Sequence, residues 1–396
     1  MSMIPYAKQS ISEQDIKAVN RVLRSDFITQ GAVVSQFEEA VASYCGAEYA
    51  VAVSHGTAAL HLACIALDVG AGDLVWTSPN SFVASANCAL YCGAKIDFVD
   101  IDPASYNISI DALKQKLLQA KQDNRLPKVL IPVHFSGQPC EMKEIKKLSE
   151  QFGFAIIEDA AHALGAEYLG EQVGSCTYSD LTIFSFHPAK MITCGEGGMI
   201  LTNNSELAVK IEQLRTHGIT RKAELMTEET HGSWYYQQTM LGFNYRITDI
   251  QAALGLSQLQ RLDEFVNKRQ KLAERYNQQL QSLSSTMLLS TPWQSPDTQS
   301  SWHLYVIRLN LKQLNIDRKA IFDQLRRADI GVHVHYIPIH TQPFYQELGF
   351  KQGDFPESES YYNEAITLPL YVDLDEQQIE YICQTLNHIL INNLNE

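Results

Sequence analysis

Seven short apolar runs alternate with helix-like segments between about residues 35 and 250 of the chain. The runs span residues 48–54, 73–79, 94–101, 128–135, 154–161, 181–187 and 197–204. Most of them lack alternation of polar and apolar residues, which is typical of strands that helices cover on both faces. The pattern therefore predicts an α/β domain in which a mostly parallel seven-stranded sheet lies between helices.

Three segments between these runs have the residue pattern of helices. They are TAALHLACIALDVG (57–70), VASANCALYCG (83–93) and MKEIKKLSEQFG (142–153). Each closes on a glycine, the residue favoured just after the last turn of a helix. We expect these three glycines to end helices of the large domain.

The pattern changes near residue 248. The segment TDIQ (248–251) has the form of a helix capping box, and apolar residues then recur at helical spacing, with a charged face to about 283. This predicts one long helix that leaves the large domain. A polar loop (284–301), a strand (303–309), a helix (318–331), a strand (332–338) and a last helix from about 375 follow. We therefore expect a large domain over 12–250 and a smaller α+β domain over 251–396, to which residues 1–11 also belong.

Composition and charge limit the classes of partner. The chain has 396 residues, 45% of them hydrophobic and 19% charged, as in an ordinary soluble globular protein. Lysine and arginine total 31 against 45 aspartate and glutamate, a net charge of −14. This balance argues against nucleic acid or an anionic membrane surface as the main partner. A small anionic ligand stays compatible, because backbone amides at a helix start bind anions whatever the net charge.

The cysteines and the chain start indicate the compartment. Eight cysteines are scattered singly without a C-x-x-C pair, so neither a zinc site nor a disulfide framework is expected. The first residues lack the basic and apolar segments of a secretory signal, and no apolar run approaches the ~20 residues of a membrane helix. We therefore expect a cytoplasmic protein.

Lys190 is the first candidate for chemistry. It lies in SFHPAKMITCGEGG (185–198), between an apolar run and a glycine-rich turn. A lysine is usually a solvated surface charge, but this position is the carboxyl end of a strand, where α/β sheets form ligand sites. A desolvated lysine has a lowered pKa and becomes an amine nucleophile. Its natural electrophile is an aldehyde, which gives a Schiff base.

Asp159 ends the apolar run 154–161 and has two interpretations. It could cap the following helix, or its carboxylate could pair with a buried cation. A pyridinium nitrogen is such a cation, and keeping it protonated makes the ring an electron sink. His162 would lie one helical turn further on the same side, where it contacts the ring or its oxygen, or is an ordinary helix histidine.

Two further strand ends carry candidate ligand groups. In SHGTAALHLA (54–63) a strand ends and a helix begins, so the free N–H groups at Gly56 and Thr57 could bind an anion; an ordinary strand–helix turn is the alternative. Phe82 follows another strand end and could stack on a planar ring or belong to the core. Neither G-x-G-x-x-G nor a P-loop occurs. Taken together with Lys190 and Asp159, these groups predict a pyridoxal 5′-phosphate site.

Five ordered segments carry a family resemblance. They are GTAAL, SFVASANCA, IIEDAAHALGAEY, FSFHPAKMITCGEGGMI and GFNYRITDIQAALGLSQL. In this order they resemble the motifs of the DegT/DnrJ/EryC1/StrS sugar aminotransferases, which act on nucleotide-linked keto-sugars. The resemblance covers nearly the whole chain. It implies a fold-type I pyridoxal phosphate enzyme that works as a homodimer, with active sites at the subunit interface.

The resemblance also implies roles for individual residues. Lys190 is the residue that binds the cofactor aldehyde and shuttles the proton, Asp159 pairs with the ring nitrogen, and His162 assists. The implied cofactor-binding residues are Gly56, Thr57, Ala58, Phe82, Asp159, His162, Ser185, Lys190 and Asn244. Asn244 would reach the phosphate of the neighbouring subunit's cofactor. One branch of the family has histidine in place of the lysine and dehydrates its substrate, so Lys190 favours transamination.

Other segments resemble the branch of the family that works in pseudaminic acid biosynthesis. They are IPYAKQSI, SDFITQG, RTHGI and VHVHYIPIH. This resemblance implies that L-glutamate gives its amino group, leaving 2-oxoglutarate, to C4 of a UDP-linked 2-acetamido-2,6-dideoxy-4-keto-hexose. The product would be UDP-4-amino-4,6-dideoxy-N-acetyl-β-L-altrosamine. The implied substrate-binding residues are Tyr6, Asp26, Phe27, Ile28, Thr29, Arg246, Val334, His335 and Tyr336.

Alternatives stay open at this point. The chain could be a C3 or C4 aminotransferase for another nucleotide keto-sugar, such as a dTDP-linked one, or a non-catalytic regulator that binds pyridoxal phosphate. The intact Lys190 argues against the regulator. His333 and His335, two residues apart on an expected strand, share a face and could bind a metal. We favour a polar cleft lining instead, because no third ligand lies near in the sequence.

Overall fold

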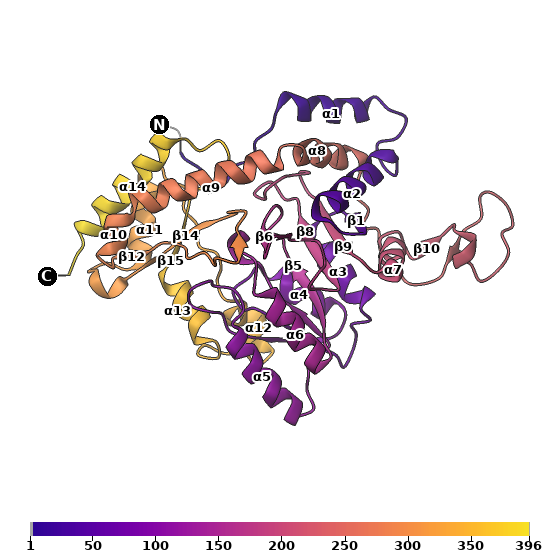
Figure 1. Cartoon of the computed structure of the whole chain (residues 1–396), viewed down its shortest axis with the longest axis horizontal. Helices are drawn as coiled ribbons and strands as arrows, with labels where there is room; N and C mark the ends of the chain where they lie inside the picture. Colours follow the sequence, from indigo (N-terminus) through magenta and orange to yellow (C-terminus); the bar gives the residue numbers. More distant parts are fainter. Residues whose placement is uncertain (1–2, 396) are drawn as a thin grey trace.

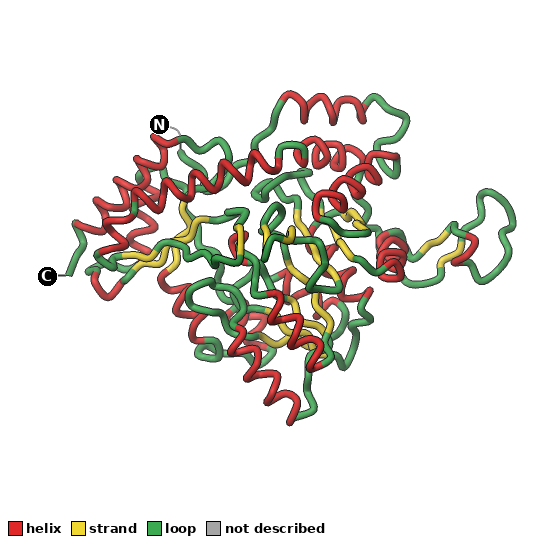
Figure 2. The backbone as a smooth tube through the Cα atoms, viewed as in Figure 1, coloured by secondary structure: helices red, strands yellow, loops and turns green. Residues whose placement is uncertain are grey.

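A seven-stranded sheet lies at the centre of the chain (Figures 1 and 2), as the computed structural model of residues 3–395 shows. Its strands are β1 (Tyr49–Val53), β2 (Leu74–Thr77), β3 (Lys95–Phe98), β4 (Val129–Ile131), β5 (Ala155–Asp159), β8 (Leu181–Ser185) and β9 (Gly198–Thr202). The order is β1-β9-β8-β5-β4-β2-β3. Only β9 runs antiparallel to its neighbours β1 and β8. Each predicted run contains one strand, so the predicted mostly parallel sheet is confirmed.

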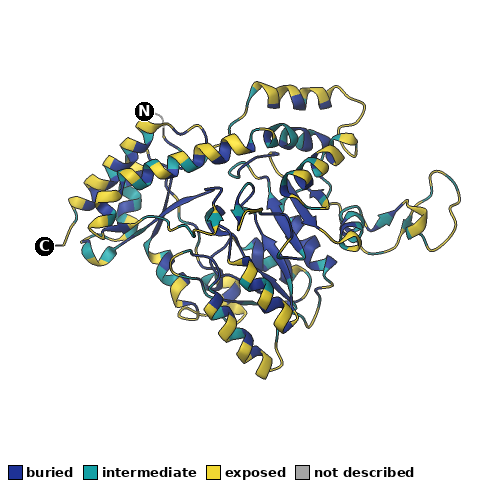
Figure 3. Ribbon diagram, viewed as in Figure 1, coloured by how far each residue is buried: buried dark blue, intermediate teal, exposed yellow. Residues whose placement is uncertain are grey.

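Helices cover both faces of this sheet because successive strand residues point to opposite sides. Ile183 packs into one apolar core with α3 (Gly56–Ala66), α4 (Ala84–Tyr91) and α7 (Ser205–Arg215). Its neighbour Phe184 packs into another core with α2 (Ala32–Cys45) and α8 (Asp249–Leu259). A third core joins α5 (Ile110–Gln122) and α6 (Met142–Phe152) to the sheet. Figure 3 shows the strands as the most deeply buried part of the chain.

Two of the three predicted helix ends are confirmed. Gly153 follows α6 with φ +79°, and Gly93 lies just beyond α4 with φ +77°. The expected end of α3 at Gly70 is wrong, because the helix already stops at Ala66. Asp68 adopts the left-handed conformation there, with φ +57°, and ends the helix in the way expected of a glycine.

The predicted long helix after residue 248 is three helices. The capping box of Thr248 and Gln251 forms as expected, but α8 stops at Leu259, and α9 (Leu262–Gln279) and α10 (Gln281–Ser285) follow. The break falls at Arg261. Its guanidinium donates to the buried carboxylate of Asp15 at 2.6 Å. That contact joins α8 and α9 to α1 (Glu13–Leu23), which lies along the outside of the molecule (Figure 1).

A second, smaller antiparallel sheet follows. It contains β12 (Leu289–Ser290), β14 (Tyr305–Leu309) and β15 (Ala365–Leu368) in the order β12-β14-β15. Its core includes residues of α9, α11 (Arg318–Arg327) and α14 (Glu376–Ile391), together with Ile4. The predicted strand over 332–338 is wrong: only His333 pairs, with Thr367, as an isolated bridge. Beyond His333, a side chain takes the place of a neighbouring strand as hydrogen-bond partner: Tyr361 Oη donates to the His335 carbonyl at 2.6 Å.

Short elements complete the chain. The stretch 284–301, expected as a loop, contains β12 and β13 (Thr298–Gln299), and β13 pairs with β6 (Glu167–Tyr168), which pairs with β7 (Glu171–Gln172). The remaining helices and strands are β10 (Ile219–Thr220), β11 (Gln237–Gln238), α12 (Pro343–Glu347) and α13 (Pro356–Glu364). The β10–β11 segment projects from the body at the right of Figure 1. From residue 3 to residue 395, the helices include none with the length and apolarity that a membrane crossing requires.

Candidate active site

A cavity of about 520 Å³ opens where β5 and β8 end. Asp159 and Ser185 are the last residues of these strands, and Gly56 begins α3 just after β1. His333, considered above as a metal ligand, lines it together with ten of the expected catalytic, cofactor- or substrate-binding residues: Tyr6, Gly56, Thr57, Phe82, Asp159, His162, Ser185, Lys190, His335 and Tyr336. The cavity therefore lies at the carboxyl ends of strands, where open α/β sheets form ligand sites.

Eight other predicted residues do not line this cavity. They are Asp26, Phe27, Ile28, Thr29, Ala58, Asn244, Arg246 and Val334. Apart from Ala58 and Val334, they belong to two segments that contact each other: Thr29 pairs with Thr248, and the Asp249 N–H donates to the Ile28 carbonyl at 3.1 Å. We call residues 26–29 and 244–249 the distal group, because the predicted residues in it do not line the cavity. The group still packs next to the cavity wall, since the Tyr245 ring lies 5.9 Å from the ring of His55.

Lys190 enters the cavity from the turn after β8. Its backbone N–H donates to the His187 carbonyl at 2.8 Å, which fixes the turn. Burial lowers the pKa of the Lys190 ammonium from 10.5 to about 8, while the nearby Asp159 carboxylate opposes the shift. Its Nζ forms no ion pair with any residue of the described range 3–395. A lysine in this state supplies an uncharged amine near neutral pH.

Asp159 is held by two hydrogen bonds at the floor of the cavity. Its Oδ2 accepts from Ser85 Oγ at 2.6 Å, and its Oδ1 accepts from the Ala161 N–H at 3.2 Å. Burial raises the pKa of this carboxyl group, and the Ser85 hydrogen bond opposes the rise. Ser85 in turn lies 2.7 Å from Ser81 Oγ. Neither serine was expected at the site, although the two lie four residues apart and flank Phe82 in sequence.

The start of α3 faces the opposite end of the cavity. His55 is its N-cap, and the His55 Nδ1 accepts from the Ala58 N–H at 2.8 Å. The Ala58 N–H is therefore occupied, whereas the N–H groups of Gly56 and Thr57 have no acceptor within the described residues. A Cβ on Gly56 would lie 3.0 Å from the Ser185 Cβ, so glycine lets the helix start approach Ser185. Free amides and a hydroxyl together suit an anion.

A wall of imidazole and phenol rings closes a further side. His162 Nδ1 accepts from the Ser136 N–H at 3.3 Å, and its Nε2 lies 3.1 Å from Tyr336 Oη. The His303 ring lies 4.4 Å from the His162 ring, and its buried Nδ1 has no partner in residues 3–395. Phe82, 59% exposed, lies at the rim. Sequence reasoning placed His303 at the start of an expected strand but assigned it no role.

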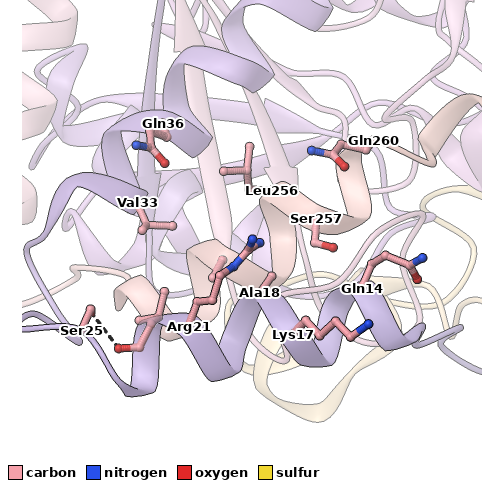
Figure 4. A pocket seen from close by; sticks show the side chains of 12 residues that line it. Gln14, Lys17, Ala18, Arg21, Ser25, Val33, Gln36, Leu256, Ser257 and Gln260 are labelled. Carbon is pink, nitrogen blue, oxygen red and sulfur yellow. Dashed lines mark hydrogen bonds between the residues drawn. The ribbon is translucent and has the colours of Figure 1, made fainter.

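The other candidate sites lack comparable chemistry. His333 and His335 stack at 4.6 Å, but the described residues contain no group of three or more ligands placed to hold a metal ion. A second cavity of about 480 Å³ lies between α1, α2 and α8. Figure 4 shows Lys17 and Arg21 of α1 beside Leu256 and Ser257 of α8. Both cations are exposed, so they remain hydrated and no buried reactive group faces that space.

Comparisons with known proteins cover nearly the whole chain. The DegT/DnrJ/EryC1/StrS aminotransferase family matches residues 9–387. A UDP-4-amino-4,6-dideoxy-N-acetyl-beta-L-altrosamine transaminase of Campylobacter jejuni is 36% identical over 388 residues, 98% of each chain. The spore coat polysaccharide biosynthesis protein SpsC of Bacillus subtilis is 38% identical over 389 residues, 98% of this chain and 97% of that protein.

Solved structures share the fold. Helicobacter pylori PseC, an aminotransferase involved in the biosynthesis of pseudoaminic acid, superposes with a TM-score of 0.90 at 30% identity and covers 99% of this chain and 100% of its own. Spr1654 from Streptococcus pneumoniae in its PLP form gives 0.88 at 28% identity, over 99% and 100%. The free amides, the buried carboxylate and the lysine of lowered pKa suit that cofactor's phosphate, ring nitrogen and aldehyde. The chain therefore belongs to the DegT/DnrJ/EryC1/StrS aminotransferase family and is an aminotransferase that uses pyridoxal 5′-phosphate.

Proposed function

We propose that this enzyme transfers the amino group of L-glutamate to C4 of a UDP-linked 2-acetamido-2,6-dideoxy-4-keto-hexose. The product is UDP-4-amino-4,6-dideoxy-N-acetyl-β-L-altrosamine, and 2-oxoglutarate leaves. The identity with the Campylobacter jejuni transaminase and the likeness to PseC support this sugar. The observation that best supports transamination is the setting of Lys190. Its amine has a lowered pKa and shares one cavity with a buried carboxylate and with N–H groups at the start of α3 that are unpaired within the described residues.

The cofactor, when bound, supplies an electron sink for the carbon that carries the amino group. Lys190 would hold the cofactor through its aldehyde group and, as a free amine, would move a proton away from the amino acid carbon. The same amine would return a proton in the second half of the exchange, because it lies beside the reacting carbon. Asp159 holds the proton on the ring nitrogen.

The remaining cavity residues position the cofactor. Gly56 and Thr57 donate backbone N–H groups to the phosphate, and Ser185 adds a hydroxyl. Ala58 supports this helix start by packing, since its N–H is already bound to His55. Phe82 covers the ring face. His162 contacts the ring from the side of Tyr336.

The distal group completes the site in a second copy of the chain. Asn244 is exposed, and it does not line the Lys190 cavity of its own chain. We therefore propose a homodimer in which Asn244 reaches the neighbouring cofactor phosphate, while Arg246 and residues 26–29 face the nucleotide sugar. Val334, His335, Tyr336 and Tyr6 bind the sugar from the cavity's own chain. All eight cysteines are free thiols, which supports a cytoplasmic enzyme.

A second candidate function is amination of another nucleotide keto-sugar, at C3 or C4. The 38% identity with SpsC, a polysaccharide biosynthesis protein, supports this second candidate, since it slightly exceeds the 36% identity with the altrosamine enzyme. A regulator that binds the cofactor without catalysis is a weaker alternative, because Lys190 and Asp159 are both present.

A two-stage assay tests the proposal. The purified chain should develop a visible absorption band with pyridoxal phosphate, lose it with glutamate, and release 2-oxoglutarate; Lys190→Ala should do none of these. The glutamate-treated enzyme is then offered a panel of UDP- and dTDP-linked keto-sugars. Preferred turnover of the UDP-linked 4-keto sugar supports the named substrate, whereas preference for another sugar supports the second candidate. A chain without the glutamate reaction contradicts both.

A further inference from the structure

We infer that Ser136, His162 and Tyr336 form a hydrogen-bond chain of fixed direction that leaves the Tyr336 O–H proton free for an oxygen of the bound molecule. Tyr336 is thereby a hydrogen-bond donor inside the Lys190 cavity, and Ser136 is a positioning residue that acts through His162. The identity of the bound molecule rests on the proposed function, but the direction of the chain does not.

The first step is the Ser136 N–H, which the fold fixes in direction. Ser136 has φ +63° in the turn Phe135–Gly137. Its Oγ donates to the Leu304 carbonyl at 2.7 Å, and its own carbonyl accepts from the His303 N–H at 2.9 Å. The Gly137 carbonyl accepts from the Ser301 N–H at 3.1 Å, so the turn is also held at its next residue. This clamped turn holds the N–H toward His162.

The second step is the tautomer of His162. A backbone N–H can only donate, so the His162 Nδ1 that receives it carries a lone pair and no proton. A neutral imidazole then carries its proton on Nε2. Burial, with the nearby positive charge of Lys190, holds the pKa of His162 well below its usual value, so the ring is neutral. Its Nε2–H therefore donates to Tyr336 Oη, 3.1 Å away.

The third step concerns the phenol. The Tyr336 oxygen accepts from His162, so its own proton is not used in that contact. No other partner of this hydroxyl occurs among residues 3–395. Burial raises the pKa of the phenol, which keeps the proton in place. Because Tyr336 and His162 both line the cavity, the free O–H has to meet an acceptor on the bound molecule: the ring oxygen of the cofactor or an oxygen of the sugar.

The direction of the chain can be tested without cofactor or substrate. Full-length protein with ¹⁵N-labelled histidine is studied by NMR, and the loss of one set of signals in His162→Gln assigns His162. We expect the Nε2–H tautomer at neutral pH, unchanged in Tyr336→Phe because Ser136 sets it. A proton on Nδ1, or a doubly protonated ring, would overturn the inference even if the enzyme is fully active.

The acceptor is identified with Tyr336→Phe in the loaded enzyme. A shift of the visible band of the pyridoxal phosphate complex, at unchanged KM for the keto-sugar, assigns the ring oxygen. A KM for the keto-sugar raised about three- to tenfold, the usual value of one neutral hydrogen bond, with an unchanged spectrum assigns the sugar. A variant that changes neither contradicts the donor role of Tyr336.

Tyr305→Phe is the matched control. Tyr305 is also a buried tyrosine, but its hydroxyl donates to Asn277 Oδ1 at 2.6 Å and it does not line the cavity. It should leave both the spectrum and the KM unchanged. If pyridoxal phosphate fails to bind at all, the proposed function is contradicted. The NMR measurement still tests the His162 tautomer independently of that outcome.

Discussion

Lys190 and Asp159 are coupled through space, and this coupling predicts a pH dependence. Only the uncharged amine attacks an aldehyde, and the pKa of Lys190 is lowered to about 8. The rate of cofactor capture should therefore rise with pH and level off above about pH 8, well below the ordinary lysine value. Stopped-flow absorbance after mixing with pyridoxal phosphate measures this rate.

Asp159→Asn provides the matched variant for that profile. The carboxylate raises the pKa of Lys190 against the effect of burial, so its removal should move the midpoint to lower pH. A midpoint near the ordinary lysine value in either protein would contradict a desolvated Lys190.

A second prediction for a single residue concerns Ser85 and the affinity for pyridoxal phosphate. Its hydroxyl is the only side chain bonded to Asp159 Oδ2 among the described residues. In Ser85→Ala the carboxylate loses a charge-assisted hydrogen bond, worth about 2 kcal/mol, and its pKa rises. Pyridoxal phosphate affinity, measured by absorbance titration, should fall by at least about tenfold. Ser81→Ala, which removes only the hydroxyl next to Ser85, should have the smaller effect.

The cavity residues found from the sequence share one property. Lys190, Asp159 and Phe82 follow apolar strands, and the carboxyl ends of such strands converge in space. Ser136 and His303 carry no comparable signal. Ser136 acts through a backbone N–H that any residue but proline possesses, and His303 reaches the cavity only after the small sheet has folded against the large one.

At the scale of elements, the link between α1 and α8–α9 predicts a loss of stability. The buried Asp15 accepts from Ser257 Oγ at 2.6 Å, Gln258 Nε2 at 2.8 Å and Arg261 at 2.6 Å. Asp15→Asn should lower the free energy of unfolding by about 2 kcal/mol, because the half-buried Arg261 guanidinium loses its carboxylate partner. Urea unfolding measures this, and Glu13→Gln on the exposed face of the same helix is the control.

The same link should weaken in acid. Burial alone raises the pKa of Asp15, but hydrogen bonds from Ser257, Ser12 and Gln258 bring it below its ordinary value. A lowered folded pKa stabilises the protein above the unfolded value of about 4 and loses this contribution as pH falls through the folded value. The stability difference between wild type and Asp15→Asn should therefore shrink below about pH 4. A constant difference would contradict the lowered pKa.

The predictions of helices and strands are confirmed where the local sequence pattern determines the structure. Most of the seven strands are apolar on both faces, so the local sequence is enough to define them. The contacts at the helix break and in the segment 332–338 come from residues distant in sequence: Asp15 accepts from Arg261, and Tyr361 donates to the His335 carbonyl. We propose that the chain divides into domains at about residue 250, with residues 1–11 joined to the second; limited proteolysis between α8 and α9 would test this division.

At the scale of the whole molecule, the distal group predicts complementation between subunits. If Asn244 serves the neighbouring chain's cavity, Asn244→Ala and Lys190→Ala proteins, each inactive alone, should regain activity when unfolded and refolded together. Random pairing makes half of the dimers mixed, and each mixed dimer has one of two sites intact, so about one quarter of wild-type activity is expected. Refolding without recovery would place Asn244 in its own chain's site.

The homodimer is also the part of the proposal that the sequence analysis reached by resemblance alone. Residues 26–29 and 244–249 carry no apolar pattern or charge cluster that marks them as a binding surface. Their contacts within the chain, such as Thr29 with Thr248, show only that they belong together. A role at a cavity they do not line becomes meaningful only when a second chain is considered.

The position of Ile4 has a consequence for biosynthesis. Ile4 pairs with Ile330 and lies in the core of the small sheet, and Tyr6, two residues on, lines the Lys190 cavity. A ribosome makes Ile4 and Tyr6 long before Ile330, so this segment has to wait without its contacts. The large sheet can assemble during synthesis, but the Lys190 cavity can close only after the segment around Ile330 has been made.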